Sequence, residues 1–265
     1  MDYSFGLTYG DQVSLESGNK LGYIFSATYD NSRVLYDGIE FGEYQRSPFD
    51  TVTDLIEATT QVGALAETNV LLGGLAGLSY KTFKSKYKFT AMHLQNGTSR
   101  AAQLAITALD GAAQVSNYNA FSNNLEYNQR GVTNLLFAGE HYLDGGDLEI
   151  EYKIAPTLST IRDPDIRKTA FSITRGDSSF EPGEGGLPSR IWRYLNEVNN
   201  VSKIDFRLKH QLFGHEAKLK FGASHLYKYR DYAIFSYNLN ERQNPNNPIT
   251  YNGDPNLVLD PNNLY

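Results

Sequence analysis

Residues 145–156, GGDLEIEYKIAP, contain the pattern that decides the fold. The apolar residues Leu148, Ile150, Tyr152 and Ile154 alternate with Glu149, Glu151 and Lys153. Successive side chains of an extended strand point to opposite sides of the sheet. The alternation therefore predicts a β-strand with one apolar and one charged face, and the function of the chain depends on what each face contacts.

Several other segments repeat this alternation, and they fall in pairs around short polar turns. The paired segments are residues 3–9 with 21–29, 69–83 with 87–97, 133–143 with 145–156, and 204–212 with 217–230. The turn of the third pair contains Gly145 and Gly146, which readily take the positive φ of a tight hairpin. These runs predict about eight antiparallel strands of roughly 9 to 14 residues each.

The segments between the pairs are polar, and at roughly 30 to 45 residues they are far longer than hairpin turns. Short turns therefore alternate with long connections along the chain. Compact soluble domains rarely contain such connections, whereas outer-membrane β-barrels combine short periplasmic turns with long extracellular loops. We expect an all-β fold, an antiparallel transmembrane β-barrel segment whose apolar faces contact lipid and whose charged faces line a wet lumen.

The composition narrows the classes of partner. The 265 residues carry 24 Lys+Arg and 30 Asp+Glu, which gives a net charge of −6, and the basic residues form no run that would bind nucleic acid. Cysteine is absent, so the sequence contains neither a disulfide nor a thiolate metal site. The sequence has no apolar run of about 18 residues that would form a membrane-spanning helix. We expect no nucleic-acid partner.

Aromatic residues are abundant, with 19 Tyr and 14 Phe against a single Trp. Nine tyrosines lie mostly toward the ends of the expected strands: Tyr9, Tyr23, Tyr29, Tyr80, Tyr87, Tyr142, Tyr152, Tyr227 and Tyr229. This placement is typical of the aromatic girdles at which a barrel meets the lipid head groups. The high strand propensity of aromatic residues is the alternative explanation for any single one of them.

We expect no catalytic residues, no metal site and no cofactor. The histidines, His93, His141, His210, His215 and His225, are scattered without the i, i+4 spacing of a helical zinc site. The glycine-rich residues 71–81 do not match the phosphate-loop pattern, so Gly73, Gly74 and Gly77 are expected to ease strand curvature or close packing. The sequence contains no G-x-S-x-G nucleophile elbow and no legible Ser-His-Asp arrangement, so enzyme activity is not expected.

Two segments contain side chains suited to a ligand. In residues 161–169, IRDPDIRKT, we expect an ion-pair cluster within a long loop rather than a calcium or ligand site. Its charged members are Asp163 and Asp165 beside Arg162, Arg167 and Lys168. Residues 190–198, RIWRYLNEV, read as a short loop helix in which Trp192 and Tyr194 either stack on a sugar or siderophore or pack against the barrel rim. The ligand-binding residues therefore remain unassigned.

Five phrases of the sequence together resemble a known family. They are GNKLGYIFSATYDNS (18–32), VLLGGLAGLSYKTFKSKYKFTAMHLQNGTSRAAQ (70–103), NNLEYNQRGVTNLLFAGEH (123–141), LSTIRDPDIRKTAF (158–171) and NGDPNLVLDPNNLY (252–265). As a set, they resemble the barrel region of TonB-dependent outer-membrane receptors, particularly those of Bacteroidetes-like bacteria. The resemblance covers essentially the whole chain, although none of the phrases is a catalytic signature.

The resemblance implies a 22-stranded barrel, plugged from within, that takes up a scarce extracellular ligand such as a siderophore, glycan, peptide or cobalamin. The inner-membrane TonB complex supplies the energy in that family. This chain shows no signal peptide, TonB box or plug, and about eight strands are far fewer than the family's set. We therefore expect residues 1–265 to be an internal part of a receptor barrel, located in the outer membrane of a Gram-negative bacterium. Its implied partners are outer-membrane lipid, the nutrient ligand, and the plug and TonB complex of the full-length receptor.

Two further function classes remain open. In the first, the chain is a soluble or surface-attached β-sandwich that binds carbohydrate, with aromatic side chains as binding platforms and apolar strand faces forming a core between two sheets. In the second, it is an outer-membrane hydrolase of the small-barrel type, which the missing nucleophile pattern disfavours.

Overall fold

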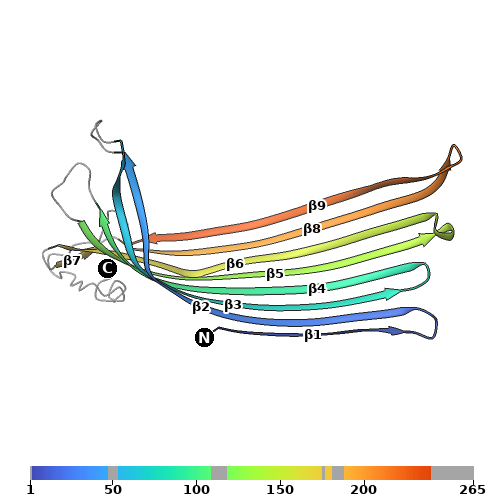
Figure 1. Ribbon diagram of the computed structural model, residues 1–265, viewed down its shortest axis with the longest axis horizontal. Coiled ribbons are helices and arrows are strands. Elements are labelled where there is room, and N and C mark those ends of the chain that lie inside the picture. The colour runs from blue at the N-terminus through green and yellow to red at the C-terminus, as the bar shows by residue number, and fades with distance from the viewer. Residues whose placement is uncertain (1, 47–52, 109–117, 175–176, 181–187, 240–265) are drawn as a thin grey trace.

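The computed structural model describes residues 2–46, 53–108, 118–174, 177–180 and 188–239. They form one antiparallel sheet in which the long strands pair with their neighbours in chain order (Figure 1). The strands are β1 (Tyr3–Ser14), β2 (Lys20–Arg46), β3 (Leu55–Lys81), β4 (Ser85–Ala108), β5 (Tyr118–Leu143), β6 (Leu148–Thr174), β7 (Asp177–Phe180), β8 (Ser189–Leu212) and β9 (His215–Asn238). The short strand β7 pairs with β6 beside this path. The expected all-β antiparallel arrangement of about eight strands is confirmed.

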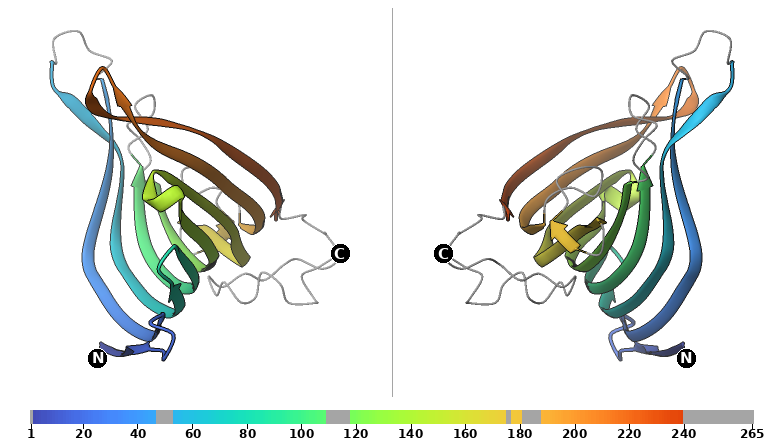
Figure 2. Two further views of the ribbon diagram at one scale, coloured as in Figure 1. Left: turned by 90° about the vertical axis from the view of Figure 1, so that its right-hand side faces the viewer. Right: turned by 90° about the vertical axis from the view of Figure 1, so that its left-hand side faces the viewer.

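The sheet is curved but not closed. Figure 2, which looks along the strands, shows β1 and β9 at opposite edges of an open sheet. Within the described residues, β1 pairs with β2 and β9 pairs with β8, so each edge strand has one free side. The described strands therefore form an open, curved meander sheet with two unpaired edges.

The tight turns occur where the sequence predicts them. The turn between β5 and β6 is a short 3₁₀ segment, η1 (Asp144–Gly146), in which Gly145 and Gly146 have φ values of 70° and 106°. The turn between β8 and β9 is Phe213–Gly214, and both residues have positive φ. Glycine takes this conformation without a steric cost, which explains Gly145, Gly146 and Gly214.

The expected strand and loop lengths are wrong. The long strands β2 to β9, apart from β7, contain 24 to 27 residues. Much of the sequence that was expected to form loops is therefore strand, including residues 161–169 at the far end of β6. Residues 190–198 also lie in β8 rather than in a short helix. These strand halves carry polar side chains on both faces, so the alternation that identifies a half-buried strand is missing there.

Two of the four register shifts between the described strands lie at residues with special backbone properties. Gly38 is unpaired between Asp37 and Ile39 in β2, and its φ is 68°. The register of β6 against β8 shifts between Asp163 and Ile166, next to Pro164, which has no N–H to donate. Such bulges bend a strand locally and increase its twist.

The register defines two faces that run across the whole sheet. One row on the first face passes from Leu21 through Tyr80, Tyr87, Gly139, Tyr152 and Ile204 to Ala223. The adjacent row on the second face passes from Lys20 through Lys81, Lys86, Glu140 and Glu151 to Asp205. We call these the apolar face and the polar face. The predicted separation of Leu148, Ile150, Tyr152 and Ile154 from the charged residues between them is confirmed by this register.

The buried apolar side chains lie far from the tight turns. They are Leu104, Ile106, Ala120, Ile166, Ala170 and Phe171, which belong to the opposite ends of β4, β5 and β6. In contrast, the apolar side chains near the turns are mostly exposed. The sheet thus leaves its largest apolar surface uncovered.

Candidate functional site: an exposed apolar band

The apolar face carries a continuous band of exposed apolar side chains on the turn half of the sheet. We call it the apolar band, and it consists of the apolar-face residues within 3–13, 21–29, 72–80, 87–91, 135–141, 148–158, 198–208 and 219–229. Phe5 and Leu7 are 63% and 61% exposed, and Phe221 is 53% exposed. Contiguous apolar surface across eight strands far exceeds the patches of ordinary soluble proteins. The band therefore marks a surface that meets an apolar environment.

Two aromatic pairs lie on the first two strands of the band, and one of them is at its far limit. Near the turn, the rings of Tyr9 and Tyr23 are 5.9 Å apart, whereas Tyr3 and Tyr29 stack at 5.7 Å farther along. The two pairs are six residues apart on β1, which corresponds to roughly 20 Å along a strand. The band on β1 extends from Tyr3 to Val13, which are ten residues or roughly 34 Å apart, and a strand tilted by about 40° needs about this length to cross an apolar layer of about 25 Å.

Eight of the nine tyrosines expected in a girdle lie on the apolar face. Tyr142 is the exception, because it pairs with Glu149 on the polar face and donates a hydrogen bond to the Glu140 carboxylate. The prediction for Tyr142 is therefore wrong. Its position near a strand end suggested a girdle. Side chains alternate along β5, however, and Tyr142 points to the polar face.

The far limit of the band crosses the strands obliquely. Tyr29 of β2 lies in the same cross-strand row as Asn196 of β8 and Asp231 of β9. At the turn side, the band on β8 reaches Leu208, four residues beyond the row of Leu21. Four residues correspond to roughly 13 Å along a strand. An oblique band is expected where strands cross an apolar layer at a tilt.

An aromatic cluster that the sequence did not reveal surrounds Tyr152 on the apolar face. The Tyr152 ring lies 5.6 Å from His141 and 5.9 Å from Phe137, and His141 meets Tyr87 edge-on at 5.3 Å. The His141 ring is fixed by a 2.9 Å hydrogen bond between its Nδ1 and Ser85 Oγ. Alternation places each residue on a face, but only the pairing of β4, β5 and β6 brings these four rings together.

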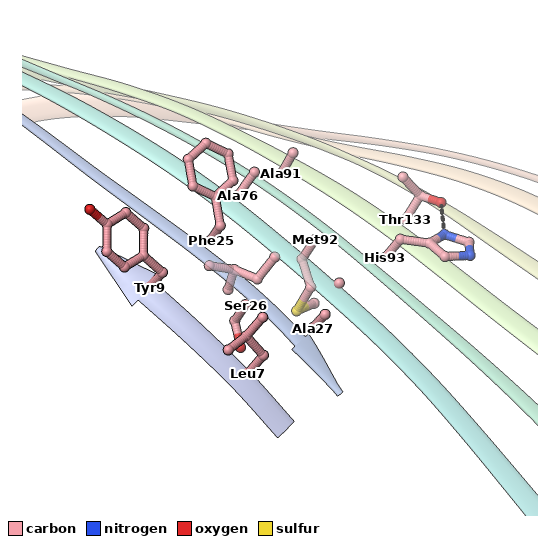
Figure 3. Close-up of a pocket in the computed structure, with 12 residues that line it drawn as sticks. Leu7, Tyr9, Phe25, Ser26, Ala27, Ala76, Ala91, Met92, His93 and Thr133 are labelled. Carbon is pink, nitrogen blue, oxygen red and sulfur yellow. Dashed lines mark hydrogen bonds between the residues drawn. The ribbon is translucent and has the colours of Figure 1, made fainter. Parts of the chain in front are cut away.

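Small side chains create a shallow hollow within the band, with a volume of about 440 Å³ (Figure 3). Its floor contains alanine and glycine, and Leu7, Tyr9 and Phe25 form one side. At the other end, His93 Nδ1 and Thr133 Oγ1 are 2.8 Å apart. The lining is almost entirely apolar, and it contains no constellation that would support catalysis.

The polar face between β6 and β8 carries a network of opposite charges. Arg207 pairs with Glu149 and also with Glu151, whose Oε2 lies 2.9 Å from its Nη2. Lys153 Nζ is 2.5 Å from Glu151 Oε1, and the neighbouring Lys203 Nζ is 2.8 Å from an Asp205 carboxylate oxygen. These carboxylates are thus compensated within the sheet.

A second ion-pair cluster occupies the far end of β6 and β8, outside the apolar band. Asp163 is only 1% exposed and accepts hydrogen bonds from Asn128 and from Arg193 Nε, the latter at 2.5 Å. Asp165 binds Arg190 through two hydrogen bonds of 2.9 and 2.6 Å. It also binds Arg167 at 2.7 Å.

The Arg190 guanidinium, followed by Arg167, holds the pKa of Asp165 below its usual range. The expected ion-pair cluster forms in part: Asp165 pairs with Arg167, but the other partners of the two aspartates, Arg190 and Arg193, come from β8. Among the described residues, Arg162 and Lys168 form no ion pair, and the cluster belongs to paired strands rather than to a loop.

Trp192 and Tyr194 each lie against an arginine side chain. The Arg190 guanidinium lies 5.0 Å from the Trp192 ring centroid, and that of Arg162 lies 5.8 Å from the Tyr194 ring. Trp192 also contacts Tyr237 of β9 edge-on at 5.7 Å. These contacts favour the packing role of the two aromatic side chains over a sugar-stacking role.

Gly73, Gly74 and Gly77 were expected to ease strand curvature or close packing, and close packing is confirmed for two of them. A Cβ on Gly73 would lie 2.5 Å from Thr28 Oγ1, and one on Gly77 would lie 2.8 Å from Ile24 Cγ2. Both glycines therefore permit close cross-strand packing. Gly74, by contrast, faces open space in the hollow.

The part of the chain that the structure describes contains neither a candidate metal site nor a candidate membrane-spanning helix. There, no group of three or more His, Asp or Glu side chains is arranged to hold a metal ion. Among the same residues, no helix has the length and apolarity needed to span a membrane. The phrase at residues 252–265 lies outside the described residues. Comparison of the chain with protein-family models, with curated proteins and with solved structures finds no match.

Proposed function

We propose that this chain is part of the wall of a TonB-dependent outer-membrane receptor that takes up a scarce extracellular ligand. The observation that carries the membrane part of the proposal is the exposed apolar band, which lies oblique to the strands. Short turns at one end and longer strand extensions at the other agree with the periplasmic and extracellular sides of such a barrel. The receptor type and the uptake of a ligand rest on the sequence resemblance.

The polar face would line the lumen in this arrangement. Its charged side chains could remain hydrated there, while the apolar face contacts lipid acyl chains. The open edges of β1 and β9 would need further strands, because unpaired backbone groups are not tolerated against lipid. Ligand contacts would come from the lumen wall and the extracellular ends, and Gram-negative outer membrane would be the location.

The β-sandwich alternative is less well supported. A sandwich buries the apolar face of one sheet against a second sheet. The described strands form one continuous sheet whose apolar face remains uncovered. The membrane-wall proposal accounts for that exposure, whereas a carbohydrate-binding sandwich does not.

Tryptophan fluorescence tests the membrane part directly. The single native tryptophan, Trp192, lies six residues beyond Val198 of the band and is first replaced by Phe. A new tryptophan is then placed on the apolar face as Ile154→Trp or on the polar face as Ala138→Trp. Ile154 and Ala138 lie in adjacent rows, so their depths are nearly matched.

The chain is reconstituted into liposomes that contain lipids brominated on their acyl chains, which quench nearby tryptophan. Strong quenching is expected for Ile154→Trp and weak quenching for Ala138→Trp. Equal quenching at the two positions, or a monomeric chain that folds cooperatively without detergent or lipid, would refute the proposed membrane wall.

A further inference from the structure

Five lysines gather on the polar side of the sheet around the turn between β3 and β4. Lys20, Lys81 and Lys86 occupy one cross-strand row, with Lys20 opposite Lys81 and Lys81 opposite Lys86. Lys88 lies in the next row of the same face, and Lys84 lies in the turn itself. All five side chains are exposed. Neighbouring strands are about 4.8 Å apart, so this arrangement concentrates positive charge on three adjacent strands.

No carboxylate among the described residues forms an ion pair with any of these five lysines. Glu140 is opposite Lys86 in the register, but its carboxylate accepts a hydrogen bond from Tyr142. The acids of β6 and β8 on the same face are instead compensated by Lys153, Lys203 and Arg207, as described above. Like charges directly opposite one another destabilise a sheet, so the uncompensated row favours an anionic partner.

An exposed aromatic side chain lies in the same turn as Lys84. Phe83, at the tip of the turn between β3 and β4, is 87% exposed and is flanked in the sequence by Lys81, Lys84 and Lys86. Inorganic phosphate would neutralise the lysines but would leave Phe83 in water. A partner that satisfies both features must carry carboxylates together with at least one apolar side chain.

We propose that Lys20, Lys81, Lys84, Lys86 and Phe83 form a docking surface, the lysine surface, for an acidic polypeptide segment with an apolar side chain. The row of lysines lies on the face opposite the apolar band, so a lipid bilayer that covers the band does not reach it. The lysine surface does not depend on which ligand the proposed receptor transports.

Peptide binding to the whole chain tests this surface. The chain is prepared in zwitterionic detergent micelles, and the fluorescence anisotropy of a labelled peptide, EELEELEE, is measured at low salt. The triple variant Lys20→Gln, Lys81→Gln, Lys86→Gln should bind at least tenfold more weakly than the unchanged chain. The matched triple variant Lys153→Gln, Lys203→Gln, Lys228→Gln loses the same charge from lysines that are already paired, and its binding should change less than twofold. Added salt should weaken binding of the unchanged chain, since exposed charges are screened.

Three further binding measurements identify the chemistry of the partner. Phe83→Ser should weaken binding of EELEELEE several-fold but leave binding of tripolyphosphate unchanged. The peptide QQLQQLQQ should not bind. Charge reversal with Lys81→Glu and Lys86→Glu should create binding of the peptide KKLKKLKK, a gain that misfolding cannot produce.

Several results would overturn the proposal. Undiminished binding by the first triple variant, or equal losses in the two triple variants, would remove the lysine row from the interface. Tripolyphosphate binding tighter than that of EELEELEE, together with an unchanged affinity in Phe83→Ser, would show a site for small anions rather than for a polypeptide.

Discussion

Replacing Gly139 with alanine should disrupt the aromatic cluster around Tyr152. A Cβ on Gly139 would lie 2.3 Å from Tyr152 Cζ and 2.4 Å from its hydroxyl oxygen. Ordinary van der Waals contacts of a Cβ are about 3.4 to 4 Å, so the Tyr152 ring would have to move by more than about 1 Å. His141 and Phe137 flank this ring at 5.6 and 5.9 Å, so the movement would break packing on both sides.

The expected cost follows from these contacts. Each aromatic pair contributes about 0.5 to 1.5 kcal/mol beyond its buried area, and overpacking costs about 1 to 3 kcal/mol. We therefore expect Gly139→Ala to lower the free energy of unfolding by about 1 to 3 kcal/mol. Gly74→Ala is the matched control, because Gly74 lies on the same face and a Cβ there meets nothing within 4 Å. This control should change stability by less than about 0.5 kcal/mol or should stabilise the strand slightly.

A double-mutant cycle isolates the contact. The chain is unfolded with urea in detergent micelles, and Gly139→Ala is measured in the unchanged chain and in a Tyr152→Leu background. The smaller leucine lacks the ring atoms that clash, so most of the penalty should disappear, which gives a coupling energy of about 1 to 2 kcal/mol. The reasoning fails if Gly139→Ala is as harmless as Gly74→Ala, or if its full cost persists in the Tyr152→Leu background.

Three other predictions concern the turns, the faces and the charge cluster. Phe213 has φ of 53° and is 93% exposed, so Phe213→Asn should stabilise the chain by roughly 1 kcal/mol in urea unfolding, and a loss of stability would contradict the strain. Ile150→Lys should reduce membrane assembly by about 2 to 4 kcal/mol, far more than Glu151→Gln; equal yields in liposome-protection assays would refute the assignment of faces. The pKa of Asp165 is lowered mainly by Arg190, so this pair stabilises the fold above the ordinary aspartate pKa and ceases to do so as the pH falls through the lowered value. Arg190→Met should therefore shift the urea midpoint more at pH 7 than in strong acid, and an equal shift at both pH values would argue against this linkage.

The sequence alone determined the strand pairs, the tight turns and the two faces of the turn half. Leu148, Ile150, Tyr152 and Ile154 could be assigned to one face because a strand repeats every two residues and one side of this strand is apolar. Gly145 and Gly146 identified their turn because few other residues take positive φ at low cost. These are local properties, and they do not depend on distant parts of the chain.

Only the tertiary structure decided the strand lengths, the open edges and the identity of cross-strand neighbours. The outer halves of β6 and β8 show no simple alternation, because polar and apolar side chains occur on both of their faces. Asp165 and Arg190 are far apart in the sequence, and the register of β6 against β8 makes them partners. The lysine row arises in the same way, because Lys20, Lys81 and Lys86 become neighbours only when three strands align. Cross-strand contacts depend on register, and register is a property of the assembled sheet.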